Sequence, residues 1–269
     1  MCNYARRAAV RRRFGGGAYL WRPDPRRPAE PSGAARGTRP VPPTALAFAS
    51  AAPAGRPPRR LLVLASGSGS NAQRLLQHFA PPAAAARVVG ILTNNRTAGV
   101  LAHAAHAGVP GVAFNREDWR SGAVQHLIKE QFRPDLLVLA GFLWLVPPPL
   151  VAAYRGGIVN IHPSLLPKFG GKGMHGAYVH TAVLAAGEAE SGITIHLVNE
   201  QYDDGAVLFQ ARCPVLATDT PATLAARVLA LEHRYLPLVV EAVVRGVAPG
   251  AFVRAAVAGT GAPDEIISP

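Results

Sequence analysis

The sequence has few of the residues that build disulfide frameworks or metal clusters, and it has no long apolar run. Only two cysteines occur in 269 residues, Cys2 and Cys213, and they lie far apart in the chain. This spacing provides no disulfide scaffold or metal-ligand motif and suits a reducing compartment. Because no apolar stretch is long enough to span a bilayer, we expect a soluble, cytoplasmic protein that binds neither metal nor membrane.

Acidic residues are scarce in the first part of the chain. Residues 1–60 hold 13 Arg and two acids, a net charge of +11, whereas the rest holds 15 Lys and Arg against 14 acids, a net charge of +1. A basic footprint therefore belongs to the N-terminal segment alone. We expect the folded domain to bind no nucleic acid.

Residues 1–58 are rich in Pro, Ala, Gly and Arg and show no lasting hydrophobic period. Such a composition cannot bury enough apolar surface to offset the entropy of ordering, so we predict a disordered extension. It could be a transit peptide, although its prolines would break an amphipathic helix. It could bind nucleic acid through Arg11, Arg12 and Arg13, be a solvated linker, or be translated from upstream of the true start. We favour the last two origins.

Short apolar runs alternate with amphipathic runs from residue 59 onward, which predicts an α/β domain over residues 59–250. The order implies a doubly wound, mostly parallel, Rossmann-like sheet. Strands are expected at residues 61–65, 88–93, 111–114, 135–140 and 157–161, and helices at 70–79, 98–107, 118–132 and 147–154.

The pattern changes in the last third of the chain. Residues 192–198 and 206–214 are joined by a short polar turn, which predicts an antiparallel pair near the C-terminal end of the domain. A long helix is expected over residues 221–245, with a kink or break at Pro237. Residues 251–269 are expected to form a loose tail.

Residues 158–169 (Ile-Val-Asn-Ile-His-Pro-Ser-Leu-Leu-Pro-Lys-Phe) are the most informative segment. Alternate strand residues face the same way, so Asn160 and His162 share one face, and Pro163 and Pro167 end the strand. An amide beside an imidazole can hold a carbonyl oxygen and transfer protons near neutral pH. The pair therefore indicates a catalytic site rather than a strand end whose histidine only bonds to backbone.

A Gly-rich turn, Ser66-Gly67-Ser68-Gly69-Ser70-Asn71, follows the first strand and opens the first helix, with Ser70 as a possible N-cap. Free N–H groups at a helix N-terminus bind anions, and glycines let the backbone approach them closely. Taken alone, a Gly-rich turn is about as typical of a plain tight turn as of an anion-binding site. Its position directly after the first strand favours a site for a phosphate monoester.

The run Asn-Ile-His-Pro-Ser-Leu-Leu-Pro-Lys resembles the signature of folate-dependent formyltransferases, and the resemblance covers roughly residues 60–248. It is most similar to the members that formylate the amine of glycinamide ribonucleotide in purine biosynthesis. The resemblance implies 10-formyltetrahydrofolate as co-substrate, small-molecule substrates, no metal, and a monomer or homodimer.

The resemblance also implies that His162, Asn160 and Asp203 converge as catalytic residues. Protonated His162 and the Asn160 amide would donate to a tetrahedral oxyanion, and Asp203 would raise the pKa of His162. By the same resemblance, the nucleotide-binding residues are Gly69, Ser70, Asn71 and Glu232. The folate-binding residues are Leu143, Trp144, Leu145, Val146, Asn199, Glu200, Gln201 and Tyr202.

The chain departs from the family pattern in three places. Residues 169–176 form an inserted Gly-rich loop, a possible lid that would bring Lys172 near phosphate or the folate tail. Asp204 replaces a common glycine after the catalytic Asp. A folate-binding Arg aligns with Asp118, although Arg116 and Arg120 lie nearby. His196 is expected to be a satisfied buried histidine.

Other functions compete with formyl transfer to the nucleotide. A formyltetrahydrofolate hydrolase shares the Asn/His motif but carries an N-terminal regulatory domain, for which residues 1–58 are unsuited. A methionyl-tRNA formyltransferase needs a further C-terminal domain. A non-catalytic nucleotide-binding module would not need Asn160, His162 and Asp203 together.

Overall fold

The computed structural model describes residues 10–13, 19–22, 57–258 and 266–267. The predicted disordered extension, residues 1–58, lies mostly outside these ranges. Two parts of it are described as strands, β1 (Val10–Arg13) and β2 (Tyr19–Arg22). Strand β2 pairs antiparallel with β5 (Gly111–Ala113), so this apolar stretch extends one edge of the central sheet.

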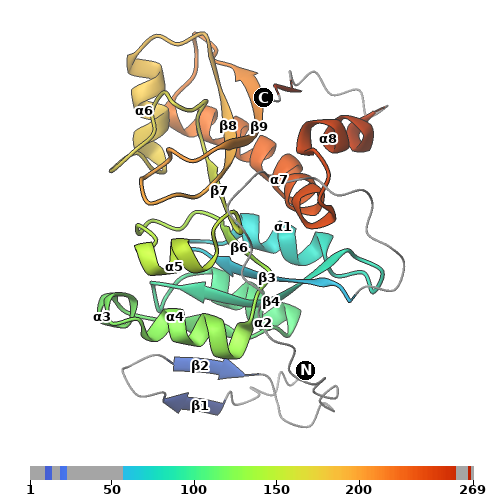
Figure 1. Ribbon diagram of the computed structural model, residues 1–269. Helices are drawn as coiled ribbons and strands as arrows, with labels where there is room; N and C mark the ends of the chain where they lie inside the picture. The colour runs from blue at the N-terminus through green and yellow to red at the C-terminus, as the bar shows by residue number, and fades with distance from the viewer. Residues whose placement is uncertain (1–9, 14–18, 23–56, 259–265, 268–269) are drawn as a thin grey trace, which may run out of the picture.

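A mixed sheet forms the centre of the molecule (Figure 1). Within the described residues the strand order is β1-β2-β5-β4-β3-β6-β7-β8-β9-β10. The inner strands β5, β4 (Ala86–Thr93), β3 (Arg59–Leu64), β6 (Leu136–Leu139) and β7 (Ile158–His162) run parallel. Strands β8 (Glu190–Leu197), β9 (Val207–Pro214) and β10 (Ile266–Ile267) continue antiparallel. The predicted mostly parallel sheet with an antiparallel C-terminal pair is confirmed.

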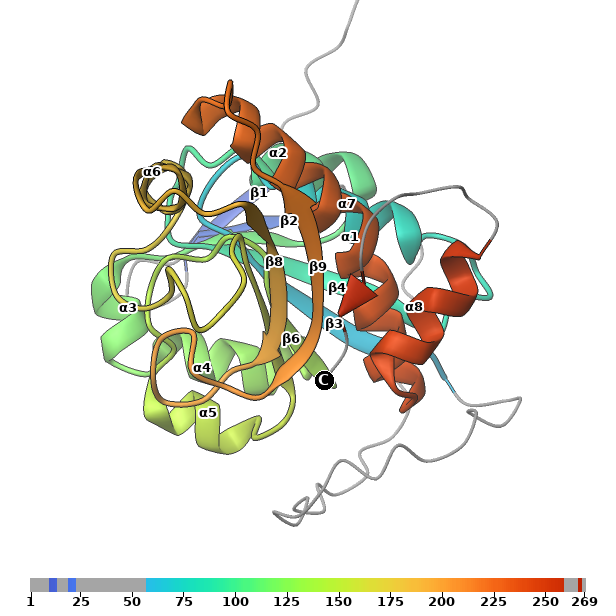
Figure 2. The same cartoon turned by 90° about the horizontal axis from the view of Figure 1, so that it is seen from above.

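Helices cover both faces of the sheet (Figure 2). Alternate residues of β3 point to opposite faces, so each face has its own apolar core. Leu61 and Val63 join the core beneath α1 (Ser70–His78), α2 (Val100–Ala107), α6 (Ala177–Ala185) and α7 (Pro221–Arg245). Leu62 and Leu64 join a second core beneath α3 (Arg116–Arg120), α4 (Ala123–Leu127), η1 (Ile128–Phe132) and α5 (Pro148–Ala153). Burial on both sides explains why these strands are almost wholly apolar.

The single helix predicted over residues 118–132 is wrong. Gly122 adopts φ 87° and separates α3 from α4, a conformation that glycine takes at little cost. The π-helical turn η1 follows and ends at Arg133, at φ 44°. The apolar spacing indicated helix correctly but could not show these local changes in winding.

Two predictions near the C-terminus also need correction. Helix α7 is not broken at Pro237, since Leu236, Val239 and Val240 are buried around it and packing outweighs the missing hydrogen bond. Residues 251–257 belong to helix α8 (Pro249–Val257), whose Val253 is fully buried, so this part of the expected loose tail is ordered by core contact. Within the described ranges, no helix is long and apolar enough to cross a membrane.

Candidate active site

Four strands bring their residues to one level across the sheet. The parallel registers align Leu64 of β3 with Leu139 of β6 and with Asn160 of β7, and the antiparallel register sets His196 of β8 opposite Asn160. The turns that follow β3 and β6 are linked, because Ser66 N–H donates to the Gly141 carbonyl and Leu143 N–H donates to Ser66 Oγ. Carboxyl ends of parallel strands are the usual place for ligands in such sheets.

Asn160, His162 and Asp203 meet in this region, as the family resemblance implied. His162 Nδ1 lies 3.4 Å from Asp203 Oδ2, and Asn160 Nδ2 donates to Asp203 Oδ1 at 3.3 Å. The His162 side chain is 4% exposed and that of Asp203 is 10% exposed. An amide, an imidazole and a carboxylate therefore form one partly desolvated cluster.

The backbone around Asp203 is tightly constrained. Asp203 has φ 54°, and its Oδ2 accepts a 2.9 Å hydrogen bond from Gly171 N–H. Gly205 follows in a space so narrow that a Cβ would overlap the Leu197 carbonyl group. Asp204, the departure from the family pattern, accepts from Asn199 Nδ2 at 3.0 Å and so stays within the turn.

The protonation states differ from the sequence expectation. Burial lowers the pKa of His162, and the Asp203 carboxylate opposes this shift without reversing it. The prediction that Asp203 raises the pKa of His162 is confirmed as one contribution, but burial outweighs it, so the expectation of a protonated His162 is wrong. Burial raises the pKa of Asp203, but contacts with His196, His162 and Gly171 N–H together hold that pKa below its ordinary value. The site thus pairs a carboxylate with a neutral imidazole at neutral pH.

The Gly-rich loop, residues 169–176, lies directly over the cluster. His162 Nε2 is 2.8 Å from the Phe169 carbonyl oxygen, which can only accept, so Nε2 carries a hydrogen. In the neutral ring, Nδ1 is then free of hydrogen. Lys172 of the same loop is exposed.

The predicted phosphate turn has the expected backbone. Gly69 adopts φ 81° as the N-cap of α1, and the Ser70 side chain makes no cap hydrogen bond, so the alternative with Ser70 as N-cap is wrong. A Cβ on Gly69 would lie 2.7 Å from the Cα of Val100, which leaves no room for another residue type. The first N–H groups of an α-helix lack intrahelical partners, so the start of α1 can offer donors to an anion.

Asn71 and Glu232 lie together beside the turn. Asn71 Nδ2 donates a short hydrogen bond to Glu232 Oε2, which joins α1 to α7. Burial raises the pKa of Glu232 to about 7, and the bond from Asn71 only partly offsets the effect of burial. Asn71 Oδ1 is buried without a hydrogen-bond partner among the described residues. Such unsatisfied polar groups are typical of a binding site rather than of a solvated helix face.

We expect Glu232→Gln to stabilise the protein at pH 8. A carboxyl whose pKa is higher in the folded state binds its proton more tightly there, so wild-type stability falls as the pH rises from 4.5 to 7. The loss amounts to about 3 kcal/mol, from roughly 1.4 kcal/mol for each tenfold change. Urea unfolding should show the variant as more stable at pH 8 and the two proteins as equal at pH 4.5. A wild type as stable as the variant at pH 8 would contradict the buried carboxyl.

The loop after β6 presents apolar side chains. Leu143 is 45% exposed and Leu145 is 38% exposed, which suits an apolar ligand, whereas Val146 is buried in the core. The Leu145 carbonyl accepts from Trp119 Nε1 at 3.0 Å, so the loop is held in place. The guanidinium of Arg116 lies 4.4 Å from the centre of the Trp144 ring.

Three positions compete for the predicted folate-binding arginine, and their surroundings differ. Asp118 is 2% exposed and forms a capping box with Asn115, so it belongs to the helix start. Arg116 instead lies on Trp144, in the predicted folate loop. Arg116 lies two residues before Asp118, the position that the ungapped alignment gives.

Residues 199–202 lie between β8 and β9 and form an internally bonded turn. Asn199 Oδ1 accepts from Gln201 N–H, and Glu200 pairs with Arg155 at 3.4 Å. Tyr202 is 38% exposed and adds apolar surface next to Asp203. This turn positions Asp203, and Tyr202 is its large exposed apolar side chain.

His196 lies closer to the predicted site than the sequence indicated. It is buried as predicted, but its Nε2 lies 3.1 Å from Asn160 Nδ2 and 3.7 Å from Asp203 Oδ1. The sequence showed that His196 lies in an alternating strand, but it could not show the cross-strand register that sets His196 opposite Asn160.

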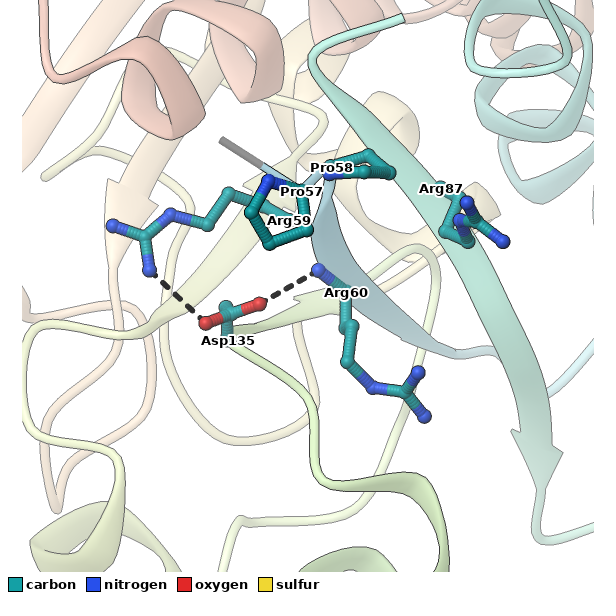
Figure 3. Close-up of a pocket in the computed structure, with 6 residues that line it drawn as sticks. All are labelled: Pro57, Pro58, Arg59, Arg60, Arg87 and Asp135. Carbon is teal, nitrogen blue, oxygen red and sulfur yellow. Dashed lines mark hydrogen bonds and ion pairs between the residues drawn. The ribbon is translucent and has the colours of Figure 1, made fainter. Parts of the chain in front are cut away.

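A separate pocket of about 340 Å³ lies at the other end of the parallel strands (Figure 3). It is lined by Pro57, Pro58, Arg59, Arg60, Arg87 and Asp135. The Asp135 carboxylate accepts from Arg59 Nη1 at 3.0 Å and from Arg60 N–H at 2.8 Å, so it fastens the start of β3. No predicted site residue lines it. Among the described residues, no group of His, Cys, Asp and Glu is arranged to hold a metal.

Known proteins are similar to this chain in sequence and in fold. A family model described as formyl transferase matches residues 59–240. The chloroplastic phosphoribosylglycinamide formyltransferase of Arabidopsis thaliana is 41% identical over 190 residues, which make up 69% of this chain and 65% of that protein; the chain thus spans less than two thirds of its length. The Escherichia coli (strain K12) phosphoribosylglycinamide formyltransferase is 35% identical over 67% of this chain and 85% of its own. The Brucella melitensis crystal structure of that name has a TM-score of 0.63 and 38% identity, covering 70% of this chain and 96% of its own.

Proposed function

Because the chain belongs to the formyl transferase family, we propose that it transfers a formyl group from 10-formyltetrahydrofolate to the amine of glycinamide ribonucleotide. The observation that carries this proposal is the meeting of Asn160, His162 and Asp203 on the sheet that also carries the phosphate turn. The relatives from Arabidopsis thaliana and Escherichia coli are named for the same activity.

The two substrates would occupy opposite ends of the site. The nucleotide phosphate binds the N–H groups at Gly69, Ser70 and Asn71, and Glu232 accepts hydrogen bonds from the ribose hydroxyls. The pterin lies against Leu143 and Leu145, with Trp144 and the turn at residues 199–202 around it. Arg116, on Trp144, is placed to bind a carboxylate of the folate tail.

The chemistry follows from the protonation states. The substrate amine attacks the formyl carbon, a C–N bond forms, and the carbonyl electrons move to oxygen. His162 Nδ1 accepts the proton released by the amine, and the resulting imidazolium faces both Asp203 and the oxyanion. The proton then passes to N10 as the bond from carbon to N10 breaks. General acid–base transfer of this kind contributes about 10²- to 10⁴-fold in rate.

A hydrolase is the nearest alternative, since water could attack the same carbon. The two activities are separated by measuring folate product by absorbance with and without glycinamide ribonucleotide. We expect turnover only when the nucleotide is present. A turnover rate that is the same with and without the nucleotide would favour the hydrolase.

Deleting residues 1–58 should leave catalysis intact. Strand β3 begins at Arg59, which is fastened to Asp135, and every proposed site residue lies after it. We expect kcat and both KM values within about twofold of the full chain, because the deletion removes the outer strands β1 and β2 but no proposed site residue. Circular dichroism shows whether the truncated protein is folded. If it is folded but inactive while the full chain is active, the segment has a catalytic role.

A further inference from the structure

The orientation of the Asn160 amide decides what this residue can do. Its nitrogen can donate two hydrogen bonds and its oxygen can only accept. The family resemblance implies that Asn160 is a second oxyanion donor, which requires an N–H directed at the substrate. The surrounding network determines whether one is available.

His196 sits directly across from Asn160 in the antiparallel pair of β7 and β8. Side chains at such opposed positions lie on the same face of the sheet, within reach of each other. His196 is 2% exposed, and its Nε2 lies 3.1 Å from Asn160 Nδ2. The pair is therefore a fixed feature of the sheet and not a chance surface contact.

The hydrogen-bonding state of His196 follows from its second nitrogen. Nδ1 lies 2.8 Å from the Leu197 carbonyl oxygen, which accepts only, so Nδ1 carries the hydrogen. In the neutral ring, Nε2 is then an acceptor and Asn160 Nδ2 is the donor. The second hydrogen of Nδ2 goes to Asp203 Oδ1, at 3.3 Å.

The reversed amide would be unfavourable on chemical grounds alone. It would place the Asn160 oxygen against the lone pair of His196 Nε2 and against the Asp203 carboxylate, which are two contacts between acceptors. Both amide hydrogens are thus engaged within the network. The Asn160 oxygen makes no hydrogen bond within the part of the chain that the structure describes.

We propose that His196 is a positioning residue that turns the Asn160 oxygen toward the substrate, where it accepts a hydrogen from the attacking amine. This inference rests on the proposed function and refines it. Asn160 orients the nucleophile, and His162 supplies the donor to the oxyanion. Accepting from the amine also directs the nitrogen lone pair at the formyl carbon, which is an orientation effect on the rate.

A double-mutant cycle tests whether His196 acts through Asn160. We expect His196→Leu to lower kcat about 10- to 100-fold with KM values changed less than about threefold, and His196→Gln, which keeps an acceptor, to recover most of the loss. In an Asn160→Ala background, His196→Leu should have no further effect. Losses that multiply in the double variant, or a His196→Leu enzyme with wild-type kcat, would overturn the proposal. Wild type that forms no formylated nucleotide would instead reject the proposed function.

A spectroscopic measurement tests the same idea without activity. In protein labelled with ¹⁵N at histidine, long-range ¹H–¹⁵N spectra distinguish the two neutral tautomers, and the His196 signals are those absent from His196→Gln. We expect a hydrogen on Nδ1 and none on Nε2. A hydrogen on Nε2 would overturn the proposal even if every leucine variant failed to fold.

Discussion

His162→Ala should lose about a thousandfold in kcat while keeping its fold. The substitution removes the group that accepts the amine proton and then faces the oxyanion, and each of these effects is worth about 10² or more in rate. The structural cost is smaller, about 1–3 kcal/mol, because the Phe169 carbonyl loses its hydrogen-bond donor. Initial rates with both substrates, together with thermal unfolding, measure the two effects separately.

His180→Ala is the matched control. His180 is also 4% exposed, and its Nδ1 has no partner among the described residues, so its removal likewise deletes a buried imidazole. We expect similar thermal stability in the two variants and a rate within a few-fold of wild type for His180→Ala only. Equal activity in both variants would remove His162 from the mechanism.

Gly69→Ala should raise KM for glycinamide ribonucleotide at least tenfold. The new methyl group would overlap the Val100 side chain, and φ 81° is a strained conformation for alanine, so the turn must move. Moving the turn withdraws the N–H groups proposed to hold the phosphate. KM for the folate substrate should stay nearly unchanged, because that ligand lies against the loop after β6.

Gly67→Ala provides the comparison within the same turn. A Cβ on Gly67 meets no atom within 4 Å and no positive φ is involved, so the alanine fits. We expect its kinetics to match wild type. If Gly69→Ala also left the nucleotide KM unchanged, the phosphate would have to bind elsewhere.

The sequence predicted the sheet well because its signals are local. Apolar runs bounded by glycine and proline mark strands, and their alternation with amphipathic runs implies parallel order. The same local signals could not show that Gly122 divides a helix, or that packing carries α7 through Pro237. Those outcomes depend on contacts between distant segments.

The site was predictable to a similar extent. Asn160 and His162 stand in one strand, so their shared face follows from period-two geometry. Asp203 is 41 residues beyond His162 in an ordinary-looking turn, and only the family resemblance pointed to it. The role of His196 depends on strand register, and the pKa of His162 depends on how much water burial removes. Neither quantity is encoded near the residue concerned.

The attachment of β3 to Asp135 has a practical consequence. This anchor lies where β3 and β6 begin, and the turns that follow these strands lie at their opposite end. A resin tether, fluorophore or fusion partner joined just ahead of Arg59 would therefore leave the molecule on the side away from both substrates. Immobilised enzyme prepared in this way should admit its ligands as freely as enzyme in solution.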